Sequence, residues 1–317
     1  MKRLLVLGWI VGVGMVAMAV GLIAQQGGQG GQGGEGKTSG KGQGRGGGGG
    51  GFGPVQKPEK VKENLYLIRG AGGNTAVFIT TNGVVLVDTK LANNGQAILD
   101  QVKSITDKAI THIINTHTHG DHTGSNPFFP ARVEIVTQAN TKTNMEKMDA
   151  FKDPMNRHGL PDRTFEDRMT LLSGKDAIDL FYFGPAHTNG DAFVVFRDLR
   201  TMHAGDVFAG KGQPFIDVSN GGSGLTFGET IGKAAAGIKD VDTVIPGHSA
   251  LMKWQDFVDF GEFNRLYLDH ARSALKAGST AEQAMADLKL PEKFKDYNLQ
   301  GGRGNNLKVI FEELQKK

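Results

Sequence analysis

The sequence predicts a layered α/β fold in one large domain. Short apolar runs typical of buried strands alternate along the chain with amphipathic stretches typical of helices. An Asn82-Gly83 pair between two apolar runs is a strong signal for a hairpin turn. About 260 of the 317 residues follow a glycine-rich N-terminal part, which is ample for a single core.

The alternation assigns the elements in order. Strands are expected at residues 61–68, 75–80, 84–87, 110–115, 133–136, 178–183, 193–196, 201–204 and 243–245. Helices are expected at residues 95–105, 139–151 and 229–238, and over most of residues 251–317. A charged segment with two prolines, residues 152–168, and a glycine-rich segment, residues 210–228, are expected to be loops.

The first 57 residues differ in composition from the rest. Lys2 and Arg3 precede an apolar run that ends near Ala24, so residues 1–24 have the pattern of a secretory signal peptide. The run is also about long enough to span a bilayer as an N-terminal membrane anchor. Glycine and glutamine dominate residues 25–57, which we expect to form a disordered linker because they bury too little apolar surface. We therefore expect a periplasmic or secreted protein, or one attached to the membrane through residues 4–24.

Composition excludes several kinds of site. The chain has no cysteine, so it has no disulfide and no thiolate ligand or nucleophile. The net charge is only +3, and no basic cluster is interleaved with aromatic side chains, so we do not expect nucleic acid as a partner. A small-molecule substrate is the expected partner. The oligomeric state is left open.

Residues 116–124, THTHGDHTG, hold four potential metal ligands behind an apolar strand. In extended chain His117 and His119 lie on the same side and can bind one ion together. The glycine that follows allows a tight turn, which presents Asp121 and His122 in another direction and suggests two adjacent metals. The alternative is a polar loop in which Asp121 or Thr123 caps the next helix. Imidazole and carboxylate at this density favour zinc.

Other candidate ligands follow other predicted strands. His187, Asp206 and His248 each come within a few residues of a strand end, beside a glycine. Loops at strand ends are where a rigid sheet positions functional groups. Asp88 ends a fully apolar strand, and a carboxylate there needs a partner, either backbone amides or a residue that binds the metal.

The motifs HTHGDH, GPAHTNGD, HAGD and IPGHS occur in this order, and with them the chain resembles the metallo-β-lactamase-fold hydrolase superfamily over roughly residues 61–249. The resemblance implies an αββα sandwich with the site at one edge of two packed sheets. It implies a catalytic domain at residues 58–250 and a helical C-terminal part, residues 251–317, packed on that domain.

The resemblance also implies the role of each site residue. One zinc would be held by His117, His119 and His187. The second would be held by Asp121, His122 and His248. Asp206 would bridge the two ions, and Asp88 would brace the ligand loop.

The residue at position 206 indicates which branches of the superfamily the chain resembles most. One class of zinc β-lactamases has a cysteine there, whereas Asp206 resembles the glyoxalase II, lactonase and ribonuclease Z branches. The glutathione-binding region of glyoxalase II is not matched. The tyrosine that usually follows the bridging aspartate in N-acyl homoserine lactonases is also missing, since Val207, Phe208 and Ala209 follow here. We therefore expect an enzyme in which an aspartate bridges two metal ions, and its substrate is left open.

The resemblance implies two zinc ions per chain that activate a water for attack on the carbonyl of a lactone, ester, thioester or lactam. Asp121 is the expected catalytic residue, because it would both bind a zinc and orient the attacking water. Iron or manganese would suit the same ligands. Two alternatives stay open: an iron-dependent enzyme similar to the persulfide dioxygenases, and a tethered metal-binding protein without catalysis. A lid around residues 154–165, within the charged segment 152–168, and the loop of residues 210–228 are expected to determine the substrate.

Overall fold

A computed structural model describes residues 53–299 and 306–316 of the chain. The predicted signal or anchor segment, residues 1–24, and most of the predicted linker, residues 25–57, lie outside the described residues. Within the described part, no helix is both long and apolar enough to cross a membrane. The end of the predicted linker already contacts the folded part, because the amide of Gln56 donates to the carbonyl of Arg69 at 2.8 Å.

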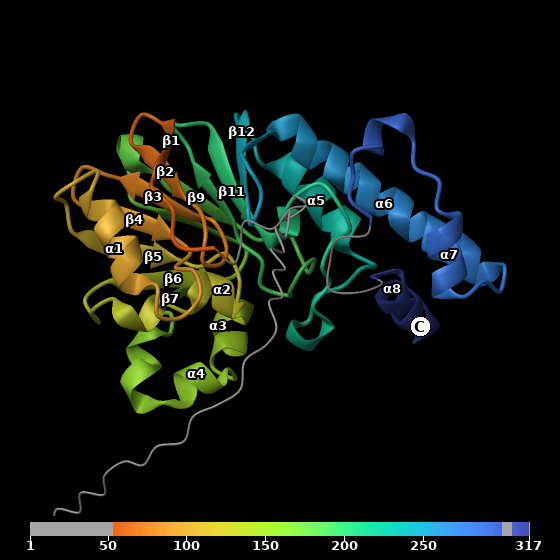
Figure 1. Cartoon of the computed structure of the whole chain (residues 1–317), viewed down its shortest axis with the longest axis horizontal. Coiled ribbons are helices and arrows are strands. Elements are labelled where there is room, and N and C mark those ends of the chain that lie inside the picture. Colours follow the sequence, from red (N-terminus) through yellow and green to blue (C-terminus); the bar gives the residue numbers. More distant parts are fainter. Residues whose placement is uncertain (1–52, 300–305, 317) are drawn as a thin grey trace, which may run out of the picture. The chain divides into compact units, whose positions relative to one another are not determined.

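Two sheets lie face to face between layers of helices, which confirms the predicted αββα sandwich (Figure 1). In the described part of the chain, the first sheet contains, in spatial order, β1 (Glu59–Lys62), β2 (Leu65–Ile68), β3 (Thr75–Ile79), β4 (Val84–Val87), β5 (Ile110–Ile114), β6 (Glu134–Gln138) and β7 (Arg163–Phe165). The second contains β13 (Met252–Lys253), β12 (Thr243–Pro246), β11 (Thr201–Gly205), β10 (Phe193–Phe196), β9 (Ile178–Phe181) and β8 (Arg168–Leu171).

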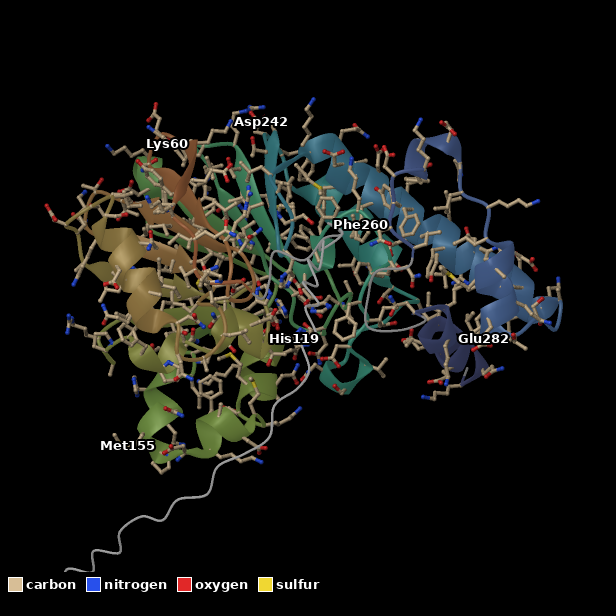
Figure 2. The ribbon with its side chains drawn as sticks, viewed as in Figure 1. Lys60, His119, Met155, Asp242, Phe260 and Glu282 are labelled. Atoms are coloured by element: carbon tan, nitrogen blue, oxygen red, sulfur yellow. The ribbon has the colours of Figure 1, made fainter. Side chains whose placement is uncertain are left out.

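Helices cover the outer face of each sheet. The α-helices of the described residues are α1 (Gly95–Lys103), α2 (Gly120–Thr123), α3 (Ala139–Met145), α4 (Asp149–Lys152), α5 (Phe227–Gly237), α6 (Trp254–Lys276), α7 (Ala281–Asp287) and α8 (Asn306–Gln315). Ile98 and Val102 of α1 pack on the first sheet. Helices α5 and α6 pack on the second sheet, and the aromatic stripe of α6, which includes Phe260 (Figure 2), is part of that core.

Strand direction explains why one edge of the sandwich carries the polar loops. Strand β4 is parallel to β5, and β11 is parallel to β12. Strand β9 runs the same way as β11, because both are antiparallel to β10. The carboxyl ends of these strands therefore meet at one edge, where His119 lies. Asp242, which precedes β12, lies at the other end of the strands (Figure 2).

Three expectations about local structure were wrong. Residues 61–68 form not one strand but the β1–β2 hairpin, whose turn contains Asn64, a residue that favours turns. Residues 139–151 form two short helices, because Met148 has an extended backbone and its sulfur contacts the hydroxyl of Thr118 at 3.7 Å. The segment 152–168 is not all loop. It contains β7, which pairs with the open edge of β6 and has no clear apolar alternation.

A buried lysine supports the loop between β2 and β3, which lies beside the polar edge. Lys90 is fully buried, and its Nζ donates to the carbonyls of Ile68 and Gly73, both at 2.8 Å. The amide of Gly73 in turn donates to the carbonyl of Asp121 at 2.9 Å. Burial lowers the pKa of the Lys90 amine to about 7, although the nearby Asp88 opposes this shift.

Replacing Phe196 by alanine should test the packing between the sheets. The rings of Phe78 and Phe196, one from each sheet, meet edge to face with centroids 5.1 Å apart, and both are buried. We expect Phe196→Ala to lower the free energy of unfolding by about 3–5 kcal/mol. The matched control is Phe128→Ala, because Phe128 is 43 % exposed. Equal losses in urea denaturation of the two variants would contradict this account of the core.

Lys90→Met should remove a pH dependence of stability. The unfolded amine has an ordinary pKa of 10.5, whereas the folded one has a pKa of about 7. Between these values the folded state binds fewer protons than the unfolded state, so wild-type stability rises with pH there, and the penalty is complete below pH 7. Relative to the variant, the wild-type free energy of unfolding should therefore rise by up to about 1.4 kcal/mol per pH unit in this range. Urea denaturation of metal-free protein from pH 6.5 to 10 would show this. A constant difference would contradict it.

Candidate metal centre

The structure brings all seven predicted ligand side chains together at the polar edge of the sandwich, in two groups. The first group is His117, His119, His187 and Asp206. The second is Asp121, His122 and His248. Within each group, one potential ligand atom per residue lies within 4.8 Å of the others.

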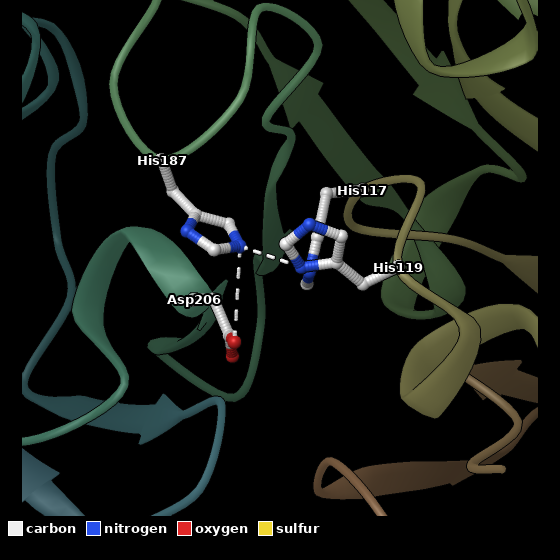
Figure 3. Close-up of side chains that lie close together, drawn as sticks. All are labelled: His117, His119, His187 and Asp206. Atoms are coloured by element: carbon white, nitrogen blue, oxygen red, sulfur yellow. Dashed lines mark hydrogen bonds and ion pairs between the residues drawn. The ribbon is translucent and has the colours of Figure 1, made fainter. Parts of the chain in front are cut away.

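The first group is formed by three separate loops (Figure 3). His117 and His119 follow β5, His187 follows β9, and Asp206 follows β11. The His187 Nε2 lies 3.0 Å from the His119 Nδ1 and 3.8 Å from the Asp206 Oδ2. His117 and His187 are buried, whereas the His119 side chain is 20 % exposed, so this group opens to solvent on the His119 side.

The second group lies on the other side of Asp206. The His122 Nε2 is 3.3 Å from the His248 Nε2. The Asp121 Oδ2 lies 3.3 Å from the His248 Nε2. Asp206 faces both groups, since its Oδ2 is 3.8 Å from the His187 Nε2 of the first group and 3.2 Å from the His248 Nε2 of the second, while its Oδ1 is 3.3 Å from the His122 Nε2. This is the position that a bridging carboxylate requires.

In four of the five histidines, one ring nitrogen is held by a group outside the cluster. The His117 Nδ1 lies 3.0 Å from the Thr116 hydroxyl, and the His187 Nδ1 donates to the carbonyl of Phe215 at 2.8 Å. The His119 Nε2 lies 2.6 Å from the Asp217 carboxylate, and the His122 Nδ1 lies 2.7 Å from the Asp88 carboxylate. A proton on each held nitrogen leaves the other nitrogen, which faces the cluster, with a free lone pair.

Asp88 braces the ligand loop, as expected from its place at the end of β4. Its Oδ1 accepts from the amide of Thr116 at 2.8 Å. Its Oδ2 accepts from the Thr116 hydroxyl at 2.7 Å and from the ring of His122. The alternative role of Asp121 as a helix cap is wrong, because His119 occupies the N-cap position of α2 and no side chain caps this helix.

Close packing requires glycines at two positions beside the ligands. A Cβ on Gly247 would lie 1.9 Å from the Asp206 Oδ1, and a Cβ on Gly73 would lie 2.2 Å from the His122 Cε1. No side chain fits at either place. The backbone therefore forms part of the wall that holds the two residues.

The electrostatics of the cluster separate the two groups. Burial and the neighbouring His122 lower the pKa of His117 well below its usual range, and burial lowers the pKa of His187 to about 4. Burial opposes ionisation of Asp206, but His122 and His248 hold the pKa of its carboxyl well below its ordinary value. Burial also opposes a charge on His248, yet Asp206 raises the pKa of His248 to about 9. The carboxylates thus stabilise positive charge on the histidines of the second group.

The donor set fits two divalent transition-metal ions. Imidazole nitrogens and carboxylate oxygens are the ligands that zinc takes in the absence of cysteine. Ligand atoms bound to one tetrahedral zinc lie roughly 3.3 Å apart, close to the separations of 3.0 Å between His119 and His187 and 3.3 Å between His122 and His248. Among the described residues, the buried His117 Nε2 and Asp206 Oδ1 have no hydrogen-bond partner, although the Asp206 Oδ1 lies 3.3 Å from the His122 Nε2. An ion would compensate both.

The sequence did not single out the groups that hold His119 and His187 from outside. Asp217 and Phe215 belong to the glycine-rich loop that was expected only to set the substrate. Asp217 opens the short 3-10 turn Val218–Asn220, and its Oδ1 accepts from the amide of Ser219 at 3.0 Å. The Asp-x-Ser-Asn pattern signals such a turn, but the contact with His119 is long-range. The Phe215 group is a backbone carbonyl, which has no sequence signal.

Comparison with known proteins agrees with this geometry. A sequence profile of the metallo-beta-lactamase superfamily matches residues 69–248, which include all seven side chains. The chain is 25% identical over 161 residues to a type 2 metallo-beta-lactamase of Elizabethkingia meningoseptica, covering 48% of this chain and 62% of that protein. It is 24% identical over 200 residues to the metallo-beta-lactamase IND-1 of Chryseobacterium indologenes, covering 59% of this chain and 80% of that protein. The chain thus spans less than two thirds of the first relative.

Solved structures share the fold at low sequence identity. The sec-alkylsulfatase Pisa1 from Pseudomonas sp. superposes with a TM-score of 0.70 at 13% identity, over 81% of this chain and 50% of that one. The metallo-beta-lactamase from Pontibacter korlensis superposes with a TM-score of 0.55 at 16% identity, over 67% of this chain and 99% of that one. Because the profile matches more than half of the 317 residues, the chain belongs to the metallo-beta-lactamase superfamily.

Proposed function

We propose that the protein is a metal-dependent hydrolase with two divalent ions, preferably zinc, that attacks a carbonyl group of a small molecule. The observation that carries the proposal is the orientation of the histidines: outer partners hold the far nitrogen of four rings, so that the near nitrogen faces the cluster. A surface cluster of histidines would not need such support. Family membership and the complete set of seven side chains also support the proposal.

The first ion would be held by His117, His119 and His187. The second would be held by Asp121, His122 and His248, with Asp206 between the two ions. When bound, such a pair lowers the pKa of a water molecule and polarises the carbonyl oxygen of the substrate.

Asp121 is the residue best placed to orient the attacking water. Its side chain is 24 % exposed, compared with 11 % for Asp206, so it is the more accessible of the two carboxylates in the cluster. Burial opposes its ionisation, but a hydrogen bond with His248 keeps the pKa of Asp121 below its ordinary value. An ionised carboxylate accepts a hydrogen bond from water and fixes the direction of its lone pair. It does not take up the proton at neutral pH, because its proton affinity is too low.

Asp206 supports an Asp-bridged branch, similar to glyoxalase II and the lactonases, in place of a cysteine-type β-lactamase. Lactones, esters and thioesters are therefore the first substrates to test, with lactams next. We further propose that the protein acts outside the cytoplasm, as a periplasmic, secreted or membrane-attached enzyme. The apolar run within residues 1–24 supports this proposal.

Elemental analysis of the purified full chain, followed by turnover assays, tests the proposal. We expect close to two zinc ions per chain and hydrolysis of at least one lactone, ester, thioester or lactam in a panel. Iron as the bound metal, together with oxygen consumption on persulfides, would favour the dioxygenase alternative. Bound metal without any turnover would favour a binding protein, and the absence of bound metal would refute the metal centre itself.

His119→Ala should reduce the bound metal to about one ion per chain and abolish measurable turnover, because it removes one of the three histidines of the first group. The fold should persist, since the His119 side chain is partly exposed. His270→Ala is the matched control, because the His270 Nε2 contacts the carbonyl of Ala284, away from the cluster. Unchanged metal content and activity in His119→Ala would overturn the ligand assignment. Far-UV circular dichroism checks the fold of both variants.

Asp217→Ala should weaken binding of one of the two ions by about 10–100-fold, the usual effect of losing an outer partner of a ligand histidine. The free ring of His119 could then rotate or change its tautomer. Asp198→Ala is the control, because Asp198 is exposed in the turn between β10 and β11. Competition with a chromophoric chelator measures both affinities. If Asp217→Ala binds zinc as tightly as Asp198→Ala, Asp217 has no role in orienting His119.

A further inference from the structure

We propose that α8 positions His119 and His187 for metal binding, through the loop of residues 211–224. The inference rests on the proposed metal centre and goes beyond it. Helix α8 begins 58 residues after the end of the matched superfamily region, yet it packs against the loop whose other side holds the two histidines (Figure 1). The loop therefore has one side on the ligands and the other on α8.

The contacts between α8 and the loop are polar at both ends and apolar between them. At the first residue of α8, the Asn306 Nδ2 donates to the carbonyl of Pro214, and the Asn306 side chain is 3 % exposed. Near the other end, the Glu313 Oε2 accepts from the amide of Gly224 at 2.8 Å. Between them lies Ile310, which is 2 % exposed and whose Cγ1 would lie 2.4 Å from a Cβ on Gly224.

The residues before α8 hold the start of the same loop. The backbone of Asn298 pairs with Gly212, and its carbonyl accepts from the amide of Gln213 at 3.2 Å. The hydroxyl of Tyr267, on α6, donates to the Gln213 Oε1 at 3.2 Å. Backbone groups and buried side chains of the C-terminal part thus fix the loop at residues 212–214 and again at Gly224.

In the loop, the residue that contacts α8 lies directly beside the residues that hold the ligand histidines. Pro214, which Asn306 contacts, is followed by Phe215, whose carbonyl accepts from the His187 Nδ1 at 2.8 Å. Two residues later, the Asp217 carboxylate lies 2.6 Å from the His119 Nε2, and the Asp217 amide donates to the His187 carbonyl at 2.9 Å. A shift of Pro214 would therefore move the partners of two metal ligands.

The second ligand group has different supports. Asp88 holds His122, and the amide of Gly73 contacts the carbonyl of Asp121. The amide of His248 donates to the carbonyl of Ala209, which precedes the loop. Among the described contacts, none joins Asp121, His122 or His248 to residues 211–224. Release of α8 should therefore weaken the binding of one ion and leave the affinity for the other unchanged.

The closing experiment compares the double variant Asn306→Ala, Glu313→Ala with wild type and with Glu312→Ala, all as full chains. Glu312 is adjacent to Glu313 on the same helix but is exposed, so its variant controls for loss of charge and for helix propensity. Zinc affinities for both ions are measured by competition with a chromophoric chelator. Circular dichroism and hydrogen exchange of the metal-free proteins report on the fold and on the loop.

We expect the double variant to bind one of its two ions about 10–100-fold more weakly and the other with wild-type affinity. Glu312→Ala should match wild type, and Glu313→Gln should keep most of the affinity, because an amide oxygen can still accept from the Gly224 amide. The inference is overturned if both ions bind with wild-type affinity although hydrogen exchange shows that the loop is released. It is also overturned if the affinities for both ions fall equally.

If the double variant fails to fold, the single variant Glu313→Ala decides by the same criteria. If wild type itself binds no zinc, the metal centre has failed, and the inference about α8 fails with it. If wild type binds two ions and the variants do not differ, only the inference about α8 fails.

Discussion

The structure depends on one constraint: several imidazole rings, most of them buried, must each present a free nitrogen to the same small volume. A partner that holds the proton on the other ring nitrogen fixes both the tautomer and the orientation of such a ring. The partners of His117, His119, His122 and His187 come from three different parts of the chain: Asp88, Thr116, and the loop that carries Phe215 and Asp217. The sandwich is the scaffold that brings these parts together, because the carboxyl ends of β4, β5, β9, β11 and β12 share one edge.

Charge has the same organising role. Asp88, Asp121 and Asp206 lie within a few ångströms of His122 or His248, and Asp206 faces both groups. Carboxylates so enclosed need positive charge nearby, supplied either by protonated histidines or by metal ions. The backbone adapts to this need, since Gly73 and Gly247 approach the ligands where no side chain fits.

The sequence carries the ligands and the fold class, because both depend on local pattern. Histidines spaced as in residues 117–122, and polar residues that directly follow apolar runs, can be recognised without coordinates. Most of the groups that hold the far ring nitrogens of the histidines cannot be recognised in this way. Asp217 contacts His119 across 98 positions, and the Phe215 carbonyl is invisible in a sequence. Strand β7 was missed because it is defined by pairing with β6 and not by its own side chains. The role of α8 depends on contacts such as Glu313 with Gly224, which are again long-range.

The most direct measurement is anomalous diffraction at the zinc edge from crystals of the zinc-loaded protein. The account predicts two strong peaks per chain, one contacted by His117, His119 and His187 and one contacted by Asp121, His122 and His248, with Asp206 contacting both. A single peak, or peaks away from these side chains, would contradict it.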